Sequence, residues 1–168
     1  MEHQPNTMKK PIITGAIFFI LDALVINQGA ISLFLIFTII LWWLPKSAFK
    51  KYTKQSPKEE LTKILIYGFI VIAVFTSNSI NNKIAQNRAN DLVLIIENFH
   101  QVTGDYPKTL NNLVPLYLPK VPQAKYTLSF NSFKYINDEG SVSLFYHAIP
   151  PFGRPTYVFD RKEWIYLD

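Results

Sequence analysis

The three histidines, His3, His100 and His147, are the first side chains to consider for catalysis. None of them has a second metal-binding residue at the spacing of a zinc site, and the chain contains no cysteine. Serines are present, but neither a nucleophile-elbow pattern nor a glycine-rich phosphate loop accompanies them. The sequence therefore predicts a protein that is not an enzyme, with no catalytic residue, no bound cofactor and no metal site.

Acidic side chains offer two weaker candidates. Glu97, His100 and Asp105 cluster near the predicted end of a helix, where a solvated helix terminus explains them most simply. Asp22 lies within a long apolar stretch, and an ionisable group in such a place is a functional-site candidate by default. Simpler explanations are also open, because a polar bend follows about one turn later. Asp22 would then reach the membrane interface, be protonated, or bond to another span.

The most distinctive exposed candidate is a proline-rich loop made of Pro150, Pro151, Phe152, Gly153 and Arg154. Loops of this kind present a stiff, extended surface that partner proteins recognise. A plain crossover between two strands is the alternative explanation. We therefore treat these five residues as a candidate partner surface.

A long helix predicted over residues 56–104 positions most of these groups. Ser56, Pro57 and Glu59 form a capped helix start, and Gly104 supplies a stop. Residues 61–79 are apolar and long enough to cross a membrane, which takes about 20 residues. Beyond Ile80, apolar residues recur at helical spacing with polar ones between them, so this half is expected to pack on a folded domain. The apolar positions are Ile84, Ala85, Ala89, Leu92, Val93, Ile96 and Phe99.

The N-terminal region divides into a polar leader, residues 1–10, and an almost continuous apolar stretch, residues 11–45. One helix over that stretch would be about 50 Å long, too long for a hydrocarbon core of about 30 Å. Polar residues at 27–29 predict a turn, and hence a transmembrane helical hairpin with arms at 12–26 and 30–44. Trp42 and Trp43 end the second arm, where aromatic belts lie. A signal peptide is the alternative, although no small-residue cleavage site is visible.

Basic residues predict the orientation. Six lysines lie between Lys46 and Lys63, in and just after a linker over 46–60, and the leader ends in Lys9 and Lys10. Both segments are expected to face the cytoplasm. Two crossings at 11–45 and a third at 61–79 then place residues 80–168 on the other side. We predict a multi-pass protein of the bacterial inner (cytoplasmic) membrane with its C-terminal domain in the periplasm or outside.

Composition agrees with a membrane protein and argues against nucleic-acid binding. The chain is 49% hydrophobic and has a mean hydropathy of +0.10, which is apolar for a soluble domain of this size. The net charge of +5 belongs mostly to the linker, because residues 79–168 carry nine basic and eight acidic side chains. A nucleic-acid footprint would instead spread basic residues over a folded face.

Residues 80–168 are predicted to form a small extracytoplasmic α+β domain. Leu110 and Leu113 share a face of a short helix that the following prolines prevent from extending. Four or five short strands follow, at 126–130, 133–136, 142–147, 156–160 and 164–167, with turns at 137–140 and 160–163. Aromatic residues alternate along these strands. One face of the sheet is thus expected to be aromatic and covered by the amphipathic helix.

The segment after the long helix carries a pattern of spaced leucines and prolines after a Tyr-Pro pair. Its residues are Tyr106, Pro107, Leu110, Leu113, Pro115, Tyr117, Leu118 and Pro122. This pattern resembles type IV pilins and type II secretion pseudopilins. In that family a half-membrane, half-soluble helix packs on a small antiparallel sheet. The resemblance implies a pilin-like fold over 61–168 and work beside a pilus or a type II secretion-like assembly.

The prepilin cleavage pattern is absent. Pilin precursors resemble a short basic leader followed by Gly-Phe and a Glu at the fifth mature position, whereas Gly68 and Phe69 here lead to Ala73. We therefore expect the full-length chain to persist, with Gly68 as a small residue that lets another span approach closely. The calcium loop of some pseudopilins is not expected, because the available oxygens lack the ligand spacing. These oxygens belong to Asp138, Glu139 and Asp160.

Two classes of function remain open. The first is a non-enzymatic interaction protein that presents a pilin-like domain beside an envelope assembly. The second is a membrane-tethered sensor or immunity-type protein whose outer domain binds a ligand or effector. The expected partners are the lipid bilayer and other membrane or envelope proteins, and a homo-oligomer is compatible with the sequence.

Overall fold

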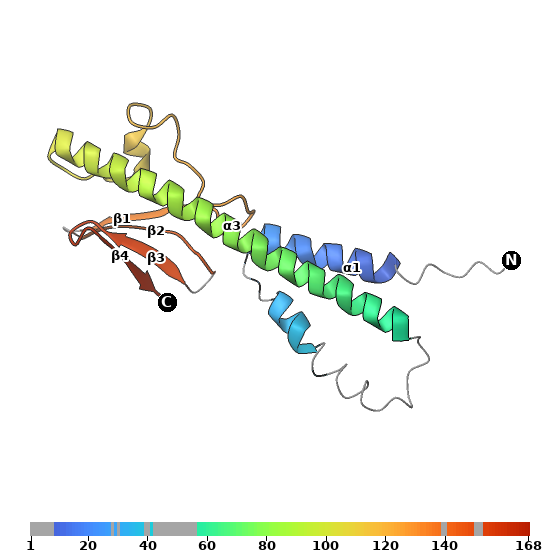
Figure 1. Ribbon diagram of the computed structural model, residues 1–168. Coiled ribbons are helices and arrows are strands. Elements are labelled where there is room, and N and C mark those ends of the chain that lie inside the picture. The colour runs from blue at the N-terminus through green and yellow to red at the C-terminus, as the bar shows by residue number, and fades with distance from the viewer. Residues whose placement is uncertain are drawn as a thin grey trace. The chain divides into compact units, whose positions relative to one another are not determined.

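The computed structural model describes residues 9–27, 29, 31–38, 41, 57–138, 141–149 and 153–168. The chain divides into two compact units, Met1–Asn78 (unit 1) and Ser79–Asp168 (unit 2). One helix, α3, runs from Pro57 to Thr103 and belongs to both (Figure 1).

Helix α3 confirms the long helix predicted over 56–104. It ends at Thr103 because Gly104 takes a left-handed conformation (φ 87°), and the Gly104 amide donates to the His100 carbonyl at 2.8 Å. The predicted capping residue Ser56 lies outside the described residues. Within α3, the stretch Leu61–Thr103 is long and apolar enough to cross a membrane by length and composition alone.

Unit 1 begins with α1 (Lys9–Phe19), which continues into the π-helix η1 (Ile20–Ile26). The first arm predicted at 12–26 thus ends where expected, at Asn27 with a left-handed backbone (φ 57°). Residues 31–38 and 41 are helical again. The rest of the second arm and most of the linker lie outside the described residues, so the transmembrane hairpin and the three-span topology stay predictions.

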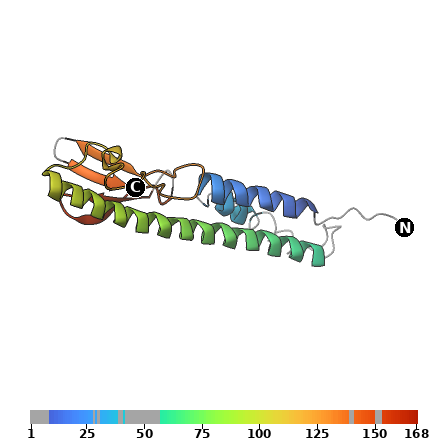
Figure 2. The same cartoon turned by 90° about the horizontal axis from the view of Figure 1, so that it is seen from above.

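Close helix contact in unit 1 centres on a glycine other than the one predicted. Helix α1 runs beside the first half of α3 and parallel to it (Figures 1 and 2), and a Cβ at Gly15 would overlap the Cδ1 atom of Ile70. Around Gly68 there is open space among the described residues. Helix α1 therefore does not use Gly68 as its contact glycine, and the approach of another span at Gly68 stays a prediction.

Unit 2 contains a four-stranded antiparallel sheet in the order β1-β2-β3-β4. The strands are β1 (Lys134–Asp138), β2 (Ser141–Phe145), β3 (Arg154–Val158) and β4 (Glu163–Leu167). The register pairs Tyr135 with Leu144 and Leu144 with Tyr157. A hairpin loop between β3 and β4 is confirmed, although the turn covers 159–162 and Glu163 of the predicted 160–163 belongs to β4. Of the turn predicted at 137–140, Asn137 and Asp138 still belong to β1, and Glu139 and Gly140 lie outside the described residues.

The strand predicted at 126–130 is wrong. Phe130 has a left-handed backbone (φ 55°), which a strand does not tolerate. The Thr127 hydroxyl donates to the Ser129 carbonyl, and the Asn131 side chain donates to the Thr127 carbonyl, both at 2.9 Å. Such local side-chain bonds to the backbone compete with a sheet ladder, so the segment folds as an irregular turn.

The core of unit 2 lies between α3 and one face of the sheet, where the predicted aromatic face is confirmed (Figure 1). The helix contributes Ala85, Ala89, Leu92, Val93 and Ile96, all of which are buried. Their spacing forms a single stripe that covers the sheet. The sheet side contributes Phe133, Val142, Leu144, Tyr146 and Phe159 as buried residues, with Tyr135, Tyr157 and Trp164 packed against them. Unit 2 is therefore an α+β domain: a long helix on a four-stranded antiparallel sheet.

Candidate interaction surface

The predicted partner surface lies in the connection between β2 and β3. The strand ladder continues past the end of β2, because the Tyr146 amide bonds to the Pro155 carbonyl at 3.4 Å and the Ala148 amide to the Gly153 carbonyl at 2.9 Å. Gly153 is buried with φ 44°, and a Cβ there would overlap the Tyr166 hydroxyl. The positive φ favours glycine, and any side chain here would also have to displace the Tyr166 ring. The connection is therefore tightly held at its base.

Of the five predicted surface residues, the structure describes two. Gly153 is a buried structural residue, and Arg154 is half-buried at the start of β3. Pro150, Pro151 and Phe152 lie outside the described residues. The Arg154 guanidinium donates to the backbone oxygen of Asp168 at 2.8 Å.

A buried lysine, which the sequence analysis missed, supports this connection. Lys125 is completely buried, and its ammonium group donates to the Ala148 carbonyl at 2.9 Å. Burial lowers the pKa of Lys125 from its ordinary value of 10.5 to about 8. The sequence gives no signal for this role, because apolar residues at alternate positions beside it predict an exposed Lys125.

Positive charge gathers around His147, at the end of β2. Burial is the largest cause that lowers the pKa of His147, and the nearby positive charges of Arg154, Lys134 and Lys125 lower it further. The imidazole packs between two rings, with centroid distances of 5.3 Å to Phe130 and 5.9 Å to Phe145. Among the described residues, no side-chain carboxylate comes within 4 Å of Lys125, Lys134 or Arg154. Lys125 is buried on the Ala148 carbonyl and Arg154 bonds to the Asp168 backbone oxygen, whereas Lys134 is exposed. Of these three cations, Lys134 is the one open to an anionic partner.

The residues that carry the pilin resemblance pack the segment after α3 onto the core. Leu110 and Leu113 are buried in the short 3₁₀ helix η2 (Leu110–Leu113), which confirms the predicted short helix. Tyr117 packs edge-on against Phe99 at 5.3 Å, and Leu118 also contacts the core. Pro107 is buried, the Val114–Pro115 peptide is cis, and Pro122 is half-buried. Apart from the exposed Pro115, these residues therefore have packing roles here.

The cluster of Glu97, His100 and Asp105 is built around Tyr106. His100 stacks on the Tyr106 ring at 4.0 Å, while Asp105 is exposed. Burial raises the pKa of Tyr106, and the Glu97 carboxylate raises it further. The predicted explanation, a solvated helix end, applies to the exposed Asp105. It does not apply to His100 and Glu97, which are half-buried. In the part of the chain that the structure describes, no three His, Cys, Asp or Glu side chains group as metal ligands, and His3 and Glu139 lie outside it.

Asp22 caps the start of the next helical segment in unit 1. Its carboxylate oxygen Oδ2 accepts from both the backbone amide and the hydroxyl of Ser32, at 2.8 and 2.7 Å. Both residues are buried. Of the explanations left open by the sequence, a bond to another segment is the one observed, because a buried carboxylate requires hydrogen-bond donors.

Unit 1 also holds an open apolar groove of about 690 Å³ between α1 and α3. Its lining includes Ile12, Phe19, Leu65 and Phe69. The hydroxyl of Thr62, also in the lining, already donates to the Lys58 carbonyl at 2.8 Å. The groove suits an apolar occupant such as a lipid acyl chain.

No protein-family model, curated protein or solved structure matches the chain. The resemblance to type IV pilins and pseudopilins therefore stays a prediction from the residues after α3.

Proposed function

We propose that this chain is a non-enzymatic integral membrane protein that presents unit 2 outside the cytoplasm for interaction with other envelope proteins, such as those of a pilus or a type II secretion-like assembly. One observation carries the proposal. The first half of α3 exposes large apolar side chains, whereas the second half buries its apolar stripe in the core of unit 2. A single helix with these two environments is suited to join a bilayer to a folded domain.

The exposed apolar residues of the first half follow the helix at regular intervals. They are Leu61, Leu65, Phe69, Ile72 and Phe75. In water such a surface would be costly, at about 25 cal/mol for each Å² left unburied. In lipid the same surface is stable, because all backbone groups of the helix are already hydrogen-bonded internally.

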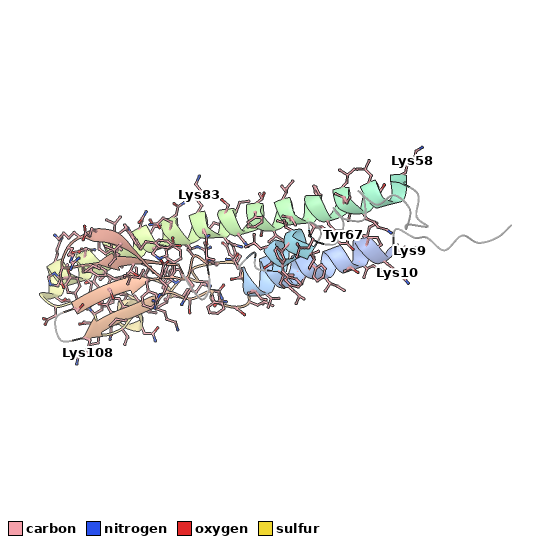
Figure 3. All side chains as sticks on the ribbon, turned by 90° about the horizontal axis from the view of Figure 1, so that it is seen from below. Lys9, Lys10, Lys58, Tyr67, Lys83 and Lys108 are labelled. Atoms are coloured by element: carbon pink, nitrogen blue, oxygen red, sulfur yellow. The ribbon has the colours of Figure 1, made fainter. Side chains whose placement is uncertain are left out.

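Charge supports the proposed orientation. Lys9 and Lys10 start α1, Lys58 lies in the first turn of α3, and all three are at the same end of unit 1 (Figure 3). This arrangement suits a shared cytoplasmic side for both helix starts. Unit 2, which follows the other end of the span, would then lie in the periplasm or outside a bacterial inner membrane.

Site-specific photo-crosslinking in cells tests the partner class. A photoreactive amino acid would replace Leu94 or Leu116, two highly exposed apolar residues of unit 2, and Lys58 would serve as the cytoplasmic-side control. Adducts of the unit 2 positions with subunits of an envelope assembly are the expected result. Adducts with one soluble ligand or effector would favour a sensor or immunity-type protein instead. No protein adduct from either position would contradict an interaction role.

A further inference from the structure

Four large apolar side chains in unit 2 remain outside the core. Tyr126, Leu128, Phe130 and Ile149 are 63, 77, 41 and 51% exposed. We name them the proximal patch. Phe130 contacts His147, two residues before Ile149, and Lys125 bonds to Ala148, so the two parts of the patch are held together. A cluster of exposed aromatic and aliphatic residues of this kind marks a contact surface.

The backbone beneath the patch is fixed. Thr127 is buried between Tyr126 and Leu128, and its hydroxyl bonds to the Ser129 carbonyl. The Ala124 amide bonds to the Asn131 carbonyl at 2.6 Å, which closes the turn. Because these bonds keep Thr127 buried, the side chains on either side of it, Tyr126 and Leu128, point outward.

The patch lies at the end of unit 2 where the chain enters it through α3. The Tyr126 amide donates to the Asn81 side chain at 3.3 Å, and Arg88 bonds to the Gln123 carbonyl at 2.7 Å and to the Tyr126 hydroxyl. Asn81 follows Phe75, the last residue of the apolar run, by about 9 Å along the helix axis at ~1.5 Å per residue. The patch is therefore held on the first residues of α3 that belong to unit 2.

Charged residues are distributed unevenly between the two ends of unit 2. Tyr146 bonds to Gln86 at 2.8 Å near this end, and Asn137 bonds to the Pro107 carbonyl at 3.1 Å near the other end. No acidic residue occurs in the stretches 79–90, 119–136 and 141–159, which include Lys83, Lys134 and Arg154. Lys134 pairs with Phe145 at the patch end of the sheet, whereas Asp138 pairs with Ser141 at the other end. One acidic residue, Asp168, does lie near the patch end, because its backbone oxygen accepts a bond from the Arg154 guanidinium. Lys83 projects outward from α3 (Figure 3).

We propose that unit 2 rests on the bilayer surface through the proximal patch, with Tyr126, Leu128, Phe130 and Ile149 in the interfacial layer and the surrounding cations near lipid phosphates. The proposal rests on membrane anchoring by α3 as part of the proposed function. Aromatic and aliphatic side chains with adjacent Lys and Arg are the composition that binds this layer, and the guanidinium of Arg88 already lies 4.4 Å from the Tyr126 ring centre. The chemistry of the surface thus fits an anionic membrane better than an acidic protein, which would leave the apolar residues in water.

Spin-label depth measurements on the full chain test this proposal. The chain has no cysteine, so L128C, I149C, L116C and F69C each give one labelling site in vesicles of phosphatidylethanolamine and phosphatidylglycerol. Leu128 and Leu116 are both highly exposed, which keeps the fold intact in either variant. We expect labels on L128C and I149C to favour collision with oxygen over a water-soluble nickel complex several-fold more than the label on L116C.

The outcomes separate the two proposals. If L128C and I149C behave like L116C while F69C lies in lipid, the patch proposal is overturned and the membrane span stands. If F69C is accessible from water, anchoring by α3 fails and the patch proposal fails with it. Labels on L128C and I149C that are shielded from both oxygen and nickel would place a protein on the patch, which also overturns the proposal.

Discussion

The ammonium nitrogen of Lys125 lies 2.9 Å from the carbonyl oxygen of Ala148, and this bond joins two segments that are 23 residues apart. It connects the turn that carries Tyr126 to the end of the β2 extension. Because the lysine is fully buried, its charged form is stabilised less than in water. This relationship gives the first prediction.

The stability of unit 2 should increase between about pH 8 and pH 10. Native Lys125 loses its proton near pH 8, whereas the unfolded chain keeps it to about 10.5, so the unfolded state binds more protons in this range. We expect the free energy of unfolding to rise by about 2 kcal/mol. Above pH 10 it should fall, because burial raises the pKa of Tyr135 and Tyr146 to about 12 in the native state only.

Urea unfolding of the full-length protein in detergent, followed by Trp164 fluorescence in a W42F/W43F background, measures this profile. The variant K125M keeps a similar side-chain volume without a titrating group. Its stability should stay level between pH 8 and pH 10. A rise of the same size in K125M would show that another group causes the effect.

Helix α3 should tolerate a charge on its exposed face and not on its buried stripe. Ile96 is fully buried against the sheet, so I96D places an unpaired carboxylate in the core and should cost about 3–5 kcal/mol. Leu94, which is 69% exposed, gives the matched control L94D. Limited proteolysis in membranes should degrade unit 2 of I96D and spare that of L94D. Equal resistance of both variants would mean that the α3 stripe does not bury against the sheet.

The bond between Asp22 and Ser32 should contribute to the stability of unit 1. In a double-mutant cycle of D22A and S32A, we expect a coupling free energy of about 1 kcal/mol, as for polar contacts between membrane helices. Denaturation of the detergent-solubilised protein by increasing dodecyl sulfate provides the measurement. Additive effects of the two substitutions would argue that the hydrogen bonds at 2.7 and 2.8 Å have no net stabilising effect.

The predicted topology places Ser141 outside the cytoplasm and Ser47 inside it. Ser141 is exposed at the start of β2, and Ser47 belongs to the lysine-rich linker. A membrane-impermeant maleimide added to spheroplasts should label S141C and leave S47C unlabelled until the membrane is permeabilised. Labelling in the opposite order would exclude the three-span model.

The full-length chain should persist in the membrane. Cleavage after Gly68 would remove α1 and η1 together with the groove they form with α3, and Ala73 would replace the glutamate of mature pilins. Mass spectrometry of the extracted protein should therefore give about 19.4 kDa, whether or not a prepilin peptidase is present. A mature chain beginning at Phe69 would identify the protein as a processed fibre subunit.

The sequence by itself determined the features that repeat with a fixed period. Ala85, Ala89, Leu92 and Ile96 lie at helical spacing, and the buried stripe of α3 follows from that spacing alone. The alternation of Val142, Leu144 and Tyr146 similarly indicated which face of β2 is buried. Such patterns are local, because a helix or strand repeats its geometry every few residues. The long helix and most of the sheet could therefore be predicted.

Contacts between residues that do not repeat at helical or strand spacing were decided only by the tertiary structure. Residues 126–130 alternate like a strand, yet the Tyr126 and Leu128 side chains are exposed. Asn81 binds the Tyr126 amide, while Ala148 and Asn131 bind the neighbouring Lys125 and Thr127. Gly15 rather than Gly68 is the contact glycine of α1 and α3, and Asp22 finds its donors at Ser32. Each of these outcomes depends on which surfaces meet when distant segments pack, and no single stretch of sequence encodes that choice.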